Sequence, residues 1–320
     1  MADDGALAVG WPGRGRRSRR RGPRVWGSGP GGAAPGGIVP AVQAAPTLIH
    51  RLPAAHSLMP YLVDPVHLVA AARSCMRRAS APGADGMTWG AYRQGLRNRL
   101  AELGQRLGMR VWEPGPLREL AITAYTGKVF TAVVPTVEDR IVHRAMRAAL
   151  EPILEARVLA DWVSGFRPAR NRITALRQAD THVAAGRRWV ADVDVAGASE
   201  GGTVEELVTW LAEYVTDGSF LAVFRQALTG LPTPLVPGSG LWPVLFHLRL
   251  SRVDAHLTGL AVVRFADNYA AFAPDAGTAE LAYGRVTQAL ATVGLRPNQR
   301  KSRLRPPHLA SPEDLFLLDG

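Results

Sequence analysis

Two aspartates in apolar, strand-like surroundings have the residue type and spacing that could do chemistry in this chain. Asp192 and Asp194 alternate with apolar residues in Trp189 to Val195, which places both on one face of a strand. Asp267 and Asn268 interrupt two apolar runs, as the turn of a β-hairpin does. Neighbouring strands could bring Asp194 and Asp267 together, and carboxylates are ligands for hard divalent cations. The pattern predicts a metal site, beside the simpler interpretation of a structural turn.

The helices and strands that position these residues can be predicted from the spacing of apolar residues. Apolar residues at helical spacing predict helices from Asp64 onward and over 88–107, 138–159, 204–214, 218–228, 242–257 and 278–293. A further hairpin is expected over 117–134, closed near Thr126-Gly127. There is no internal repeat. This order of helices, hairpins and strands favours an α+β fold.

Composition points to a polyanionic partner. Lys and Arg number 38 against 27 Asp and Glu, a formal charge of +11, and Lys128 and Lys301 are the only lysines. Such an excess favours nucleic acid, because each neutralised phosphate releases counterions. Residues 1–45 are rich in Gly, Pro and Arg, which predicts a disordered basic arm ahead of one domain over 46–320. The arm is either an RNA-binding tail or a neutral extension.

The cysteine content and the hydropathy of the chain indicate its cellular compartment. Cys75 is the only cysteine, so the sequence predicts no intramolecular disulfide and a cytoplasmic location. No apolar run approaches the roughly 20 residues that span a bilayer, so no membrane segment is expected. The histidines lack the paired spacing of zinc ligands.

Five ordered stretches resemble motifs of reverse transcriptases of the group II intron type. They are Ala81 to Thr88 (APGADGMT), Val134 to Val142 (VPTVEDRIV), Gly165 to Arg170 (GFRPAR), Asp192 to Glu200 (DVDVAGASE) and the hairpin around Phe265-Ala-Asp-Asn268. The likeness extends over about 58–320, and five motifs in order are far more specific than one. It implies a right-hand polymerase fold of fingers and palm, with an antiparallel palm sheet flanked by helices. Leu315 to Gly320 resembles the primer-grip strand, after which no thumb is expected.

The resemblance implies RNA-directed DNA polymerase activity. In that family two Mg²⁺ ions, for which Mn²⁺ can substitute, promote nucleotidyl transfer from a dNTP to the 3′-OH of a DNA primer on an RNA template. By the same resemblance Asp194 and Asp267 are catalytic and bind metal together with the Val195 carbonyl and Asn268. Lys301, in Asn-Gln-Arg-Lys-Ser, matches the family lysine that protonates or steadies the pyrophosphate.

Substrate-binding residues are carried over from the same motifs. Nucleotide binding is expected at Lys128, Ser199 and Gly238. Nucleic-acid binding is expected at Arg140, Arg167 and Arg170.

Departures from the family pattern fall on substrate-handling positions. Asn268 replaces the second hairpin aspartate, which should lower metal affinity. Phe130 replaces an arginine for the triphosphate, so a charge-assisted hydrogen bond of about 1.5–3 kcal/mol is missing. Ser199 replaces the aromatic that excludes a ribose 2′-hydroxyl, and the loop 236–243 lacks the family glutamine.

These departures keep a second interpretation open, a catalytically inactive reverse-transcriptase-like RNA-binding protein or remnant. A third is a fragment whose thumb comes from a separate chain. A structured RNA would be a further partner in any of these cases.

Overall fold

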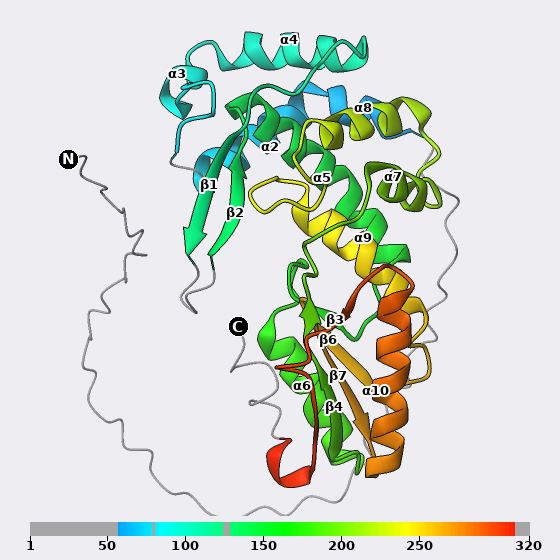
Figure 1. Ribbon diagram of the computed structural model, residues 1–320. Helices are drawn as coiled ribbons and strands as arrows, with labels where there is room; N and C mark the ends of the chain where they lie inside the picture. Colours follow the sequence, from blue (N-terminus) through cyan, green and yellow to red (C-terminus); the bar gives the residue numbers. More distant parts are fainter. Residues whose placement is uncertain (1–56, 79–80, 124–128, 311–320) are drawn as a thin grey trace, which may run out of the picture. The chain divides into compact units, whose positions relative to one another are not determined.

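The computed structural model describes residues 57–78, 81–123 and 129–310, whose helices and strands are shown in Figure 1. Helices and mixed sheets confirm the predicted α+β class. Within the described residues, no helix is long and apolar enough to cross a membrane.

Every described residue belongs to one unit, which spans His50–Gly320. The arm predicted for 1–45 and the strand predicted for 315–320 lie outside the described residues.

A five-stranded sheet in the order β3-β6-β7-β4-β9 carries the strand before Asp194 and the strands on either side of Asp267. Only β3 and β6 run parallel, and the other neighbours are antiparallel. Its central strands combine valine and aromatic residues, which suit a pleated and buried surface, with alanine. The strands are Val163–Ser164 (β3), Trp189–Val193 (β4), Val262–Phe265 (β6), Asn268–Ala273 (β7) and Arg303–Arg305 (β9).

Helices cover both faces of this sheet. On one face, Ala175 and Ala179 of α6 (Arg172–Ala184) pack with Val190 and Phe272 in a small apolar cluster. On the other face, alternate residues of the same strands join the main core beneath α9 and α10. These two helices are Trp242–Ala255 (α9) and Ala276–Ala291 (α10).

The helix α6 is absent from the sequence-based prediction. Its buried positions, Ala175 and Ala179, are small, so no stripe of large apolar residues marks the segment. The available signal was the capping box, in which Asn171 and Thr174 satisfy each other's backbone N–H groups.

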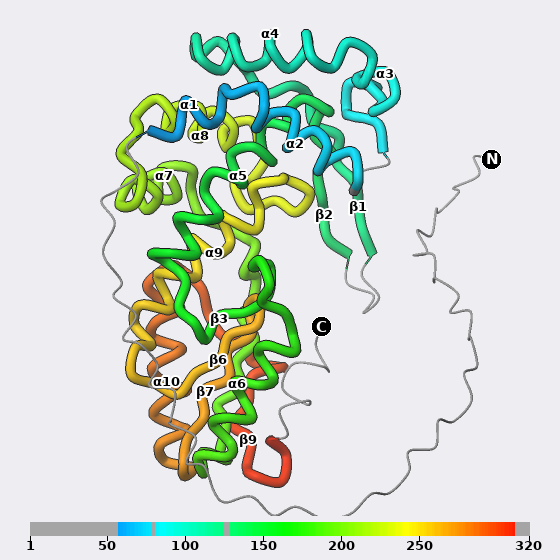
Figure 2. Tube along the Cα trace, turned by 180° about the vertical axis from the view of Figure 1, so that it is seen from behind, coloured from blue at the N-terminus to red at the C-terminus, as the bar shows by residue number. Residues whose placement is uncertain are grey.

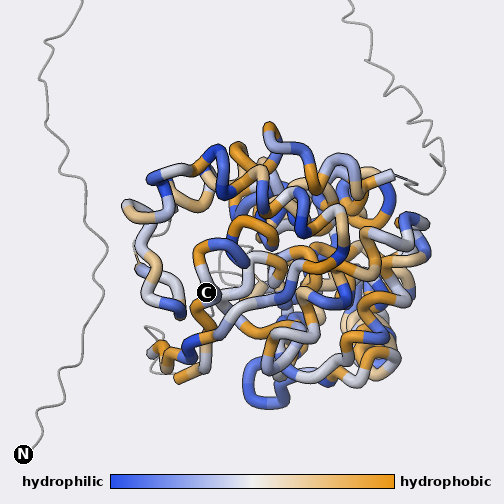
Figure 3. The backbone as a smooth tube through the Cα atoms, turned by 90° about the horizontal axis from the view of Figure 1, so that it is seen from above, coloured by the Kyte–Doolittle hydropathy of each residue, from blue (hydrophilic) through white to orange (hydrophobic). Residues whose placement is uncertain are grey.

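Helices dominate the rest of the described chain, where blue and orange stretches alternate along the tubes of Figure 3, as in amphipathic helices with one buried face. The single helix predicted over 88–107 is wrong, because Gly95 adopts φ +73° and separates two helices. The helices are Met59–Val63 (α1), Pro65–Arg78 (α2), Trp89–Arg93 (α3), Leu96–Gly108 (α4), Val137–Arg157 (α5), Val204–Ala212 (α7) and Gly218–Thr229 (α8).

The hairpin predicted over 117–134 is present as β1 (Arg118–Thr123) and β2 (Val129–Val134), and its tip lies outside the described residues. Val133 donates its backbone N–H to the Pro237 carbonyl at 2.8 Å, which ties the loop before α9 to β2. The remaining elements are Val195–Ala196 (β5), Arg296–Pro297 (β8) and the 3₁₀ turn Pro307–Leu309 (η1).

Candidate active site

A tight β6–β7 turn presents Asp267. Phe265 pairs with Asn268, so Ala266 and Asp267 form the two-residue turn. The sequence-based assignment of Asp267-Asn268 as the turn pair is wrong by one residue, since Asn268 already begins β7. Ala266 carries the positive φ, +55°, a conformation that costs residues with a Cβ free energy.

A glycine loop supports this turn. Ala266 donates its N–H to the Ser164 carbonyl at 3.0 Å. At the next residue, Gly165 with φ +84°, a Cβ would lie 2.8 Å from the Ala266 nitrogen. His247 Nε2 lies 3.1 Å from the Gly165 carbonyl. A side chain at position 165 would therefore displace the turn that carries Asp267.

A buried polar network fixes the other side of the turn. Arg264 donates to both carboxylate oxygens of Asp254, at 3.1 and 2.7 Å, and from Nη1 to the Ala266 carbonyl at 2.8 Å. Tyr269 donates its hydroxyl to Asp254 at 2.9 Å. All three side chains are buried. None of these three residues was predicted as a site residue from the sequence, although an arginine within the apolar run Val-Val-Arg-Phe is a usable signal.

Asp194 directly follows β4 and is anchored by the segment that contains Lys301. The Asp194 carbonyl accepts from the Asn298 N–H at 2.8 Å and the Ser302 hydroxyl at 3.1 Å. Lys301 Nζ lies 3.2 Å from Asp194 Oδ2, with side-chain exposures of 41% and 14%. The structure thus brings together Asp194 and Lys301, two residues that the sequence analysis proposed for one site.

Asp194 and Asp267 also interact. Val193 pairs with Tyr269, so continuing the register by one residue places Asp194 opposite Asn268, the neighbour of Asp267. Burial raises the pKa of the Asp267 carboxyl, and the charge of Asp194 raises it further, whereas Lys301 opposes the shift. Repulsion between the carboxylates is a reason for this site to attract a cation.

The oxygen donors around this pair suit a hard cation, although carboxylates are few. Within the part of the chain that the structure describes, no group of three His, Cys, Asp or Glu could hold a metal ion. Asp194 and Asp267 are both half-buried, as is Asn268, and Val195 is buried and pairs with Pro297. Two carboxylates, an amide and a carbonyl are all oxygen donors, the class that Mg²⁺ and Mn²⁺ prefer.

Asp192 has a structural partner. Arg305 Nε donates to Asp192 Oδ2 at 2.6 Å, and both side chains are at most 10% exposed. This ion pair links β4 to β9 rather than adding a carboxylate to the Asp194–Asp267 pair.

The predicted nucleotide-binding positions are distributed over several elements. Ser199 is half-buried in the loop that follows β5. Gly238 has φ +95°, and a Cβ there would lie 2.1 Å from the Val133 carbonyl oxygen, so only glycine fits. Phe130 is half-buried in β2, and Lys128 lies outside the described residues. Their part in nucleotide binding stays a prediction.

The three arginines expected to contact nucleic acid are engaged with protein oxygens in this structure. Arg140 donates to the carbonyls of Pro135, Ala81 and Pro82. Arg167, whose side chain is 3% exposed, donates to Glu155 and two carbonyls, and Arg170 donates to Asp161. These bonds stabilise loops, and nucleic-acid binding by these arginines stays a prediction.

Fold and site together define an α+β protein with an interacting aspartate pair and a lysine at the end of a sheet. No protein-family model matches the chain. Protein YkfC of Escherichia coli (strain K12) is 28% identical over 224 residues, covering 62% of this chain and 56% of the relative. The mitochondrial nuclear intron maturase 1 of Arabidopsis thaliana is 30% identical over 101 residues, covering 32% of this chain and 14% of the relative.

The group II intron-encoded protein LtrA of Lactococcus lactis subsp. cremoris is 31% identical over 100 residues, covering 31% of this chain and 16% of the relative. Two solved chains, from a partial and a full Cas6-RT-Cas1–Cas2 complex, each align with 74% of this chain at 17% identity and TM-score 0.38, covering 42% and 26% of those chains. The curated relatives confirm the resemblance seen in the motifs: this chain contains a reverse-transcriptase-like domain that is distantly similar to group II intron proteins. The chain spans 56% or less of the length of each of these curated relatives.

Proposed function

We propose that this chain is an RNA-directed DNA polymerase domain of low activity, which extends a DNA primer on an RNA template with dNTPs. The observation that carries the proposal is the electrostatic coupling of Asp267 with Asp194 and Lys301, which come from separate segments. In this proposal the five-stranded sheet with α6, α9 and α10 is the palm, and β1–β2 with the helices around it forms the fingers.

The aspartate pair fits divalent cations by its donor chemistry. Asp194, Asp267, the Val195 carbonyl and the Asn268 amide would hold Mg²⁺ or Mn²⁺, which when bound would activate the primer 3′-oxygen and stabilise the leaving pyrophosphate. Asn268 is the weak member of this set, because an amide oxygen carries no formal charge. We therefore expect weaker metal binding than with a third carboxylate.

The protein's own groups have separate roles in this proposal. The Arg264–Asp254–Tyr269 network holds the turn so that Asp267 stays close to Asp194. Lys301 neutralises part of the charge of Asp194 and is exposed enough to meet a pyrophosphate, to which it would donate a proton.

The substituted positions favour a second candidate function, a nucleic-acid-binding protein without polymerase activity. Phe130 pairs with Ile122 on β1, so the hairpin presents apolar side chains where the family has an arginine. Asn268 stands where the family has a second hairpin aspartate, so the proposed metal site has one carboxylate fewer. A protein that only bound RNA would tolerate both changes.

Primer extension separates the two candidates. The wild type, Asp267→Ala and the control Asp180→Ala would be assayed on poly(rA)/oligo(dT) with dTTP and either Mg²⁺ or Mn²⁺. Asp180 is an exposed carboxylate on α6. We expect incorporation by the wild type and the control and none by Asp267→Ala. Equal incorporation by all three, or none by the wild type with both metals, would reject the polymerase proposal.

A further inference from the structure

A basic groove lies among the helices α2, α3 and α4, separate from the candidate active site. It has a volume of about 380 Å³. Figure 2 shows the three helices that contribute to it, at the opposite end of the described fold from the strands β6 and β7. The groove is lined by Arg73, Met76, Arg77, Arg93 and Leu96.

The three groove arginines differ from other arginines in this region, which form ion pairs with carboxylates. Arg106 pairs with Glu138, and Arg147 pairs with Glu151. By contrast, Arg73, Arg77 and Arg93 are exposed, and within the described residues none lies in an ion pair with a carboxylate. No carboxylate among the described residues therefore offsets these three charges, and mutual repulsion makes their proximity unfavourable without an anion.

The groove also has an apolar base. Met76 and Leu96 are half-buried and pack against the main core. Arg93 donates from Nη2 to Met76 Sδ at 3.8 Å, so an edge of its guanidinium lies against this base, although the residue as a whole is exposed. The arginines consequently surround a defined depression.

We propose that this groove binds the phosphate backbone of an RNA strand, as a contact separate from the Asp194–Asp267 site. Arg73 and Arg77 are one helical turn apart, so their Cβ atoms are about 5–6 Å from each other. That spacing is comparable with the separation of successive phosphates along a strand. Each planar guanidinium can donate two parallel hydrogen bonds to one phosphate.

Such charges could also attract an acidic peptide. The shape of the groove favours RNA over a peptide. A helix docked in a groove uses apolar anchors at several successive turns, whereas this base offers only Met76 and Leu96. The formal charge of +11 likewise suits a polyanion longer than the groove itself.

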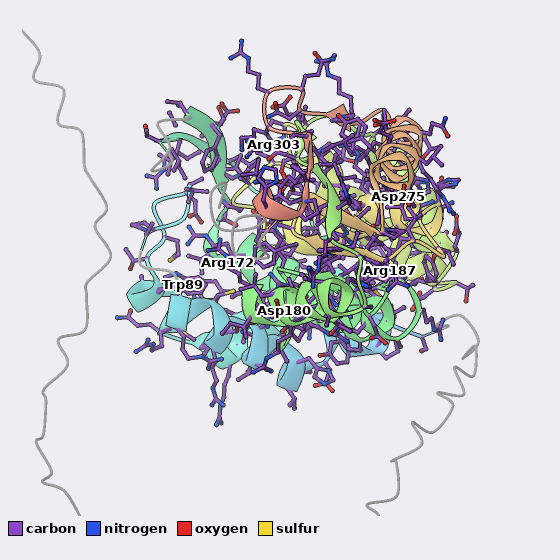
Figure 4. All side chains as sticks on the ribbon, turned by 90° about the horizontal axis from the view of Figure 1, so that it is seen from below. Trp89, Arg172, Asp180, Arg187, Asp275 and Arg303 are labelled. Atoms are coloured by element: carbon purple, nitrogen blue, oxygen red, sulfur yellow. The ribbon has the colours of Figure 1, made fainter. Side chains whose placement is uncertain are left out.

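The test measures salt-dependent RNA binding by fluorescence anisotropy with a fluorescein-labelled poly(U) strand. EDTA is present, so divalent cations at the aspartate pair play no part. The variant Arg73→Gln/Arg77→Gln/Arg93→Gln is compared with Arg177→Gln/Arg187→Gln/Arg188→Gln, which removes three exposed arginines of α6 and the turn after it. Figure 4 labels Trp89 of α3 and Arg187 at separate places on the molecule. Both variants have the same net charge.

Plotted as log K against log salt, binding by the groove variant should fall less steeply than binding by the wild type. We expect the magnitude of the slope to decrease by about 2 to 3 between roughly 50 and 200 mM salt in the groove variant, and by less than about 1 in the control. A variant with lysines at all three groove positions keeps the charges and should keep the slope. Equal losses in the groove and control variants, or a loss in the lysine variant as large as in the glutamine variant, would overturn the proposal.

An unchanged RNA slope in the groove variant would also overturn it, and loss of poly-glutamate binding in that variant would then identify an acidic protein partner. The result does not depend on polymerase activity. RNA binding in EDTA is measured without primer extension, so failure of primer extension and failure of this proposal are distinguishable.

Discussion

Arg264 of β6 and Asp254 of α9 form an ion pair of 2.7 Å between side chains that are 0% and 4% exposed. Arg264 also donates to the carbonyl of Ala266, the residue before Asp267. A buried charge pair in the interior is thereby connected to the turn that carries a proposed metal ligand.

Breaking that pair should destabilise the protein strongly. Asp254→Ala leaves the Arg264 guanidinium buried without its counter-ion, and we expect the free energy of unfolding to fall by about 3–5 kcal/mol. Urea denaturation measures the loss. Glu205→Ala is the control, because Glu205 pairs with Arg225 at exposures of 69% and 48% and should contribute about 0–1 kcal/mol. Similar losses in both variants would contradict the prediction.

Gly238 should tolerate no side chain. In Gly238→Ala the Cβ would meet the Val133 carbonyl oxygen at 2.1 Å, which forces the loop away from β2. Gly186→Ala is the matched control. Gly186 also has a positive φ, +83°, but a Cβ there would meet nothing within 4 Å. We expect Gly238→Ala to lose about 1–3 kcal/mol more than Gly186→Ala in thermal or urea unfolding, as overpacking does. Equal losses would show that the loop moves freely.

The stability contribution of Asp267 should depend on pH in a defined direction. Burial raises the pKa of this carboxyl in the folded state, with Asp194 adding to the shift. Because the pKa of Asp267 is raised in the folded state, the contribution of this residue to stability is complete below its unfolded-state pKa. That contribution is lost as the pH rises through its folded-state pKa. Asp267→Asn should therefore be more stable than the wild type at pH 7, and the difference should vanish below about pH 4.

Thermal unfolding of both proteins across this pH range provides the measurement. At neutral pH, adding Mn²⁺ should raise the melting temperature of the wild type more than that of Asp267→Asn. A variant less stable than the wild type at pH 7 in EDTA would show that burial and the charge of Asp194 do not raise the pKa of Asp267 in the folded protein.

Restoring the two substituted family residues should increase primer extension. Phe130→Arg adds a donor for the triphosphate, worth about 1.5–3 kcal/mol, or roughly a tenfold to hundredfold lower KM for dTTP. Asn268→Asp adds a carboxylate to the metal ligands and should lower the Mn²⁺ concentration needed. The control Thr131→Arg/Asn268→Asp places the arginine on the opposite face of β2, where strand alternation directs it away. Equal gains in both double variants would exclude a specific role for position 130.

Local patterns in the sequence determined the α+β class, most of the long helices and the two strand regions that bear Asp194 and Asp267. Apolar periodicity and turn residues are short-range signals, and they can be recognised without knowing what an element packs against. The ordered motifs also established the resemblance to reverse transcriptases of the group II intron type. The helix α6 escaped because its buried residues are small, and the break at Gly95 escaped because apolar residues continue at helical spacing on both sides of it.

Only the tertiary structure decided which charged residues meet. Asp192 and Arg305 are 113 residues apart, and nothing local distinguishes Asp192 from Asp194 two positions later. The pairing of β4 with β9 directs the first toward an arginine, whereas the end of β4 leaves the second beside Lys301 and Asp267. Long-range strand pairing and burial determine these partners, so residue type and spacing alone could not assign them.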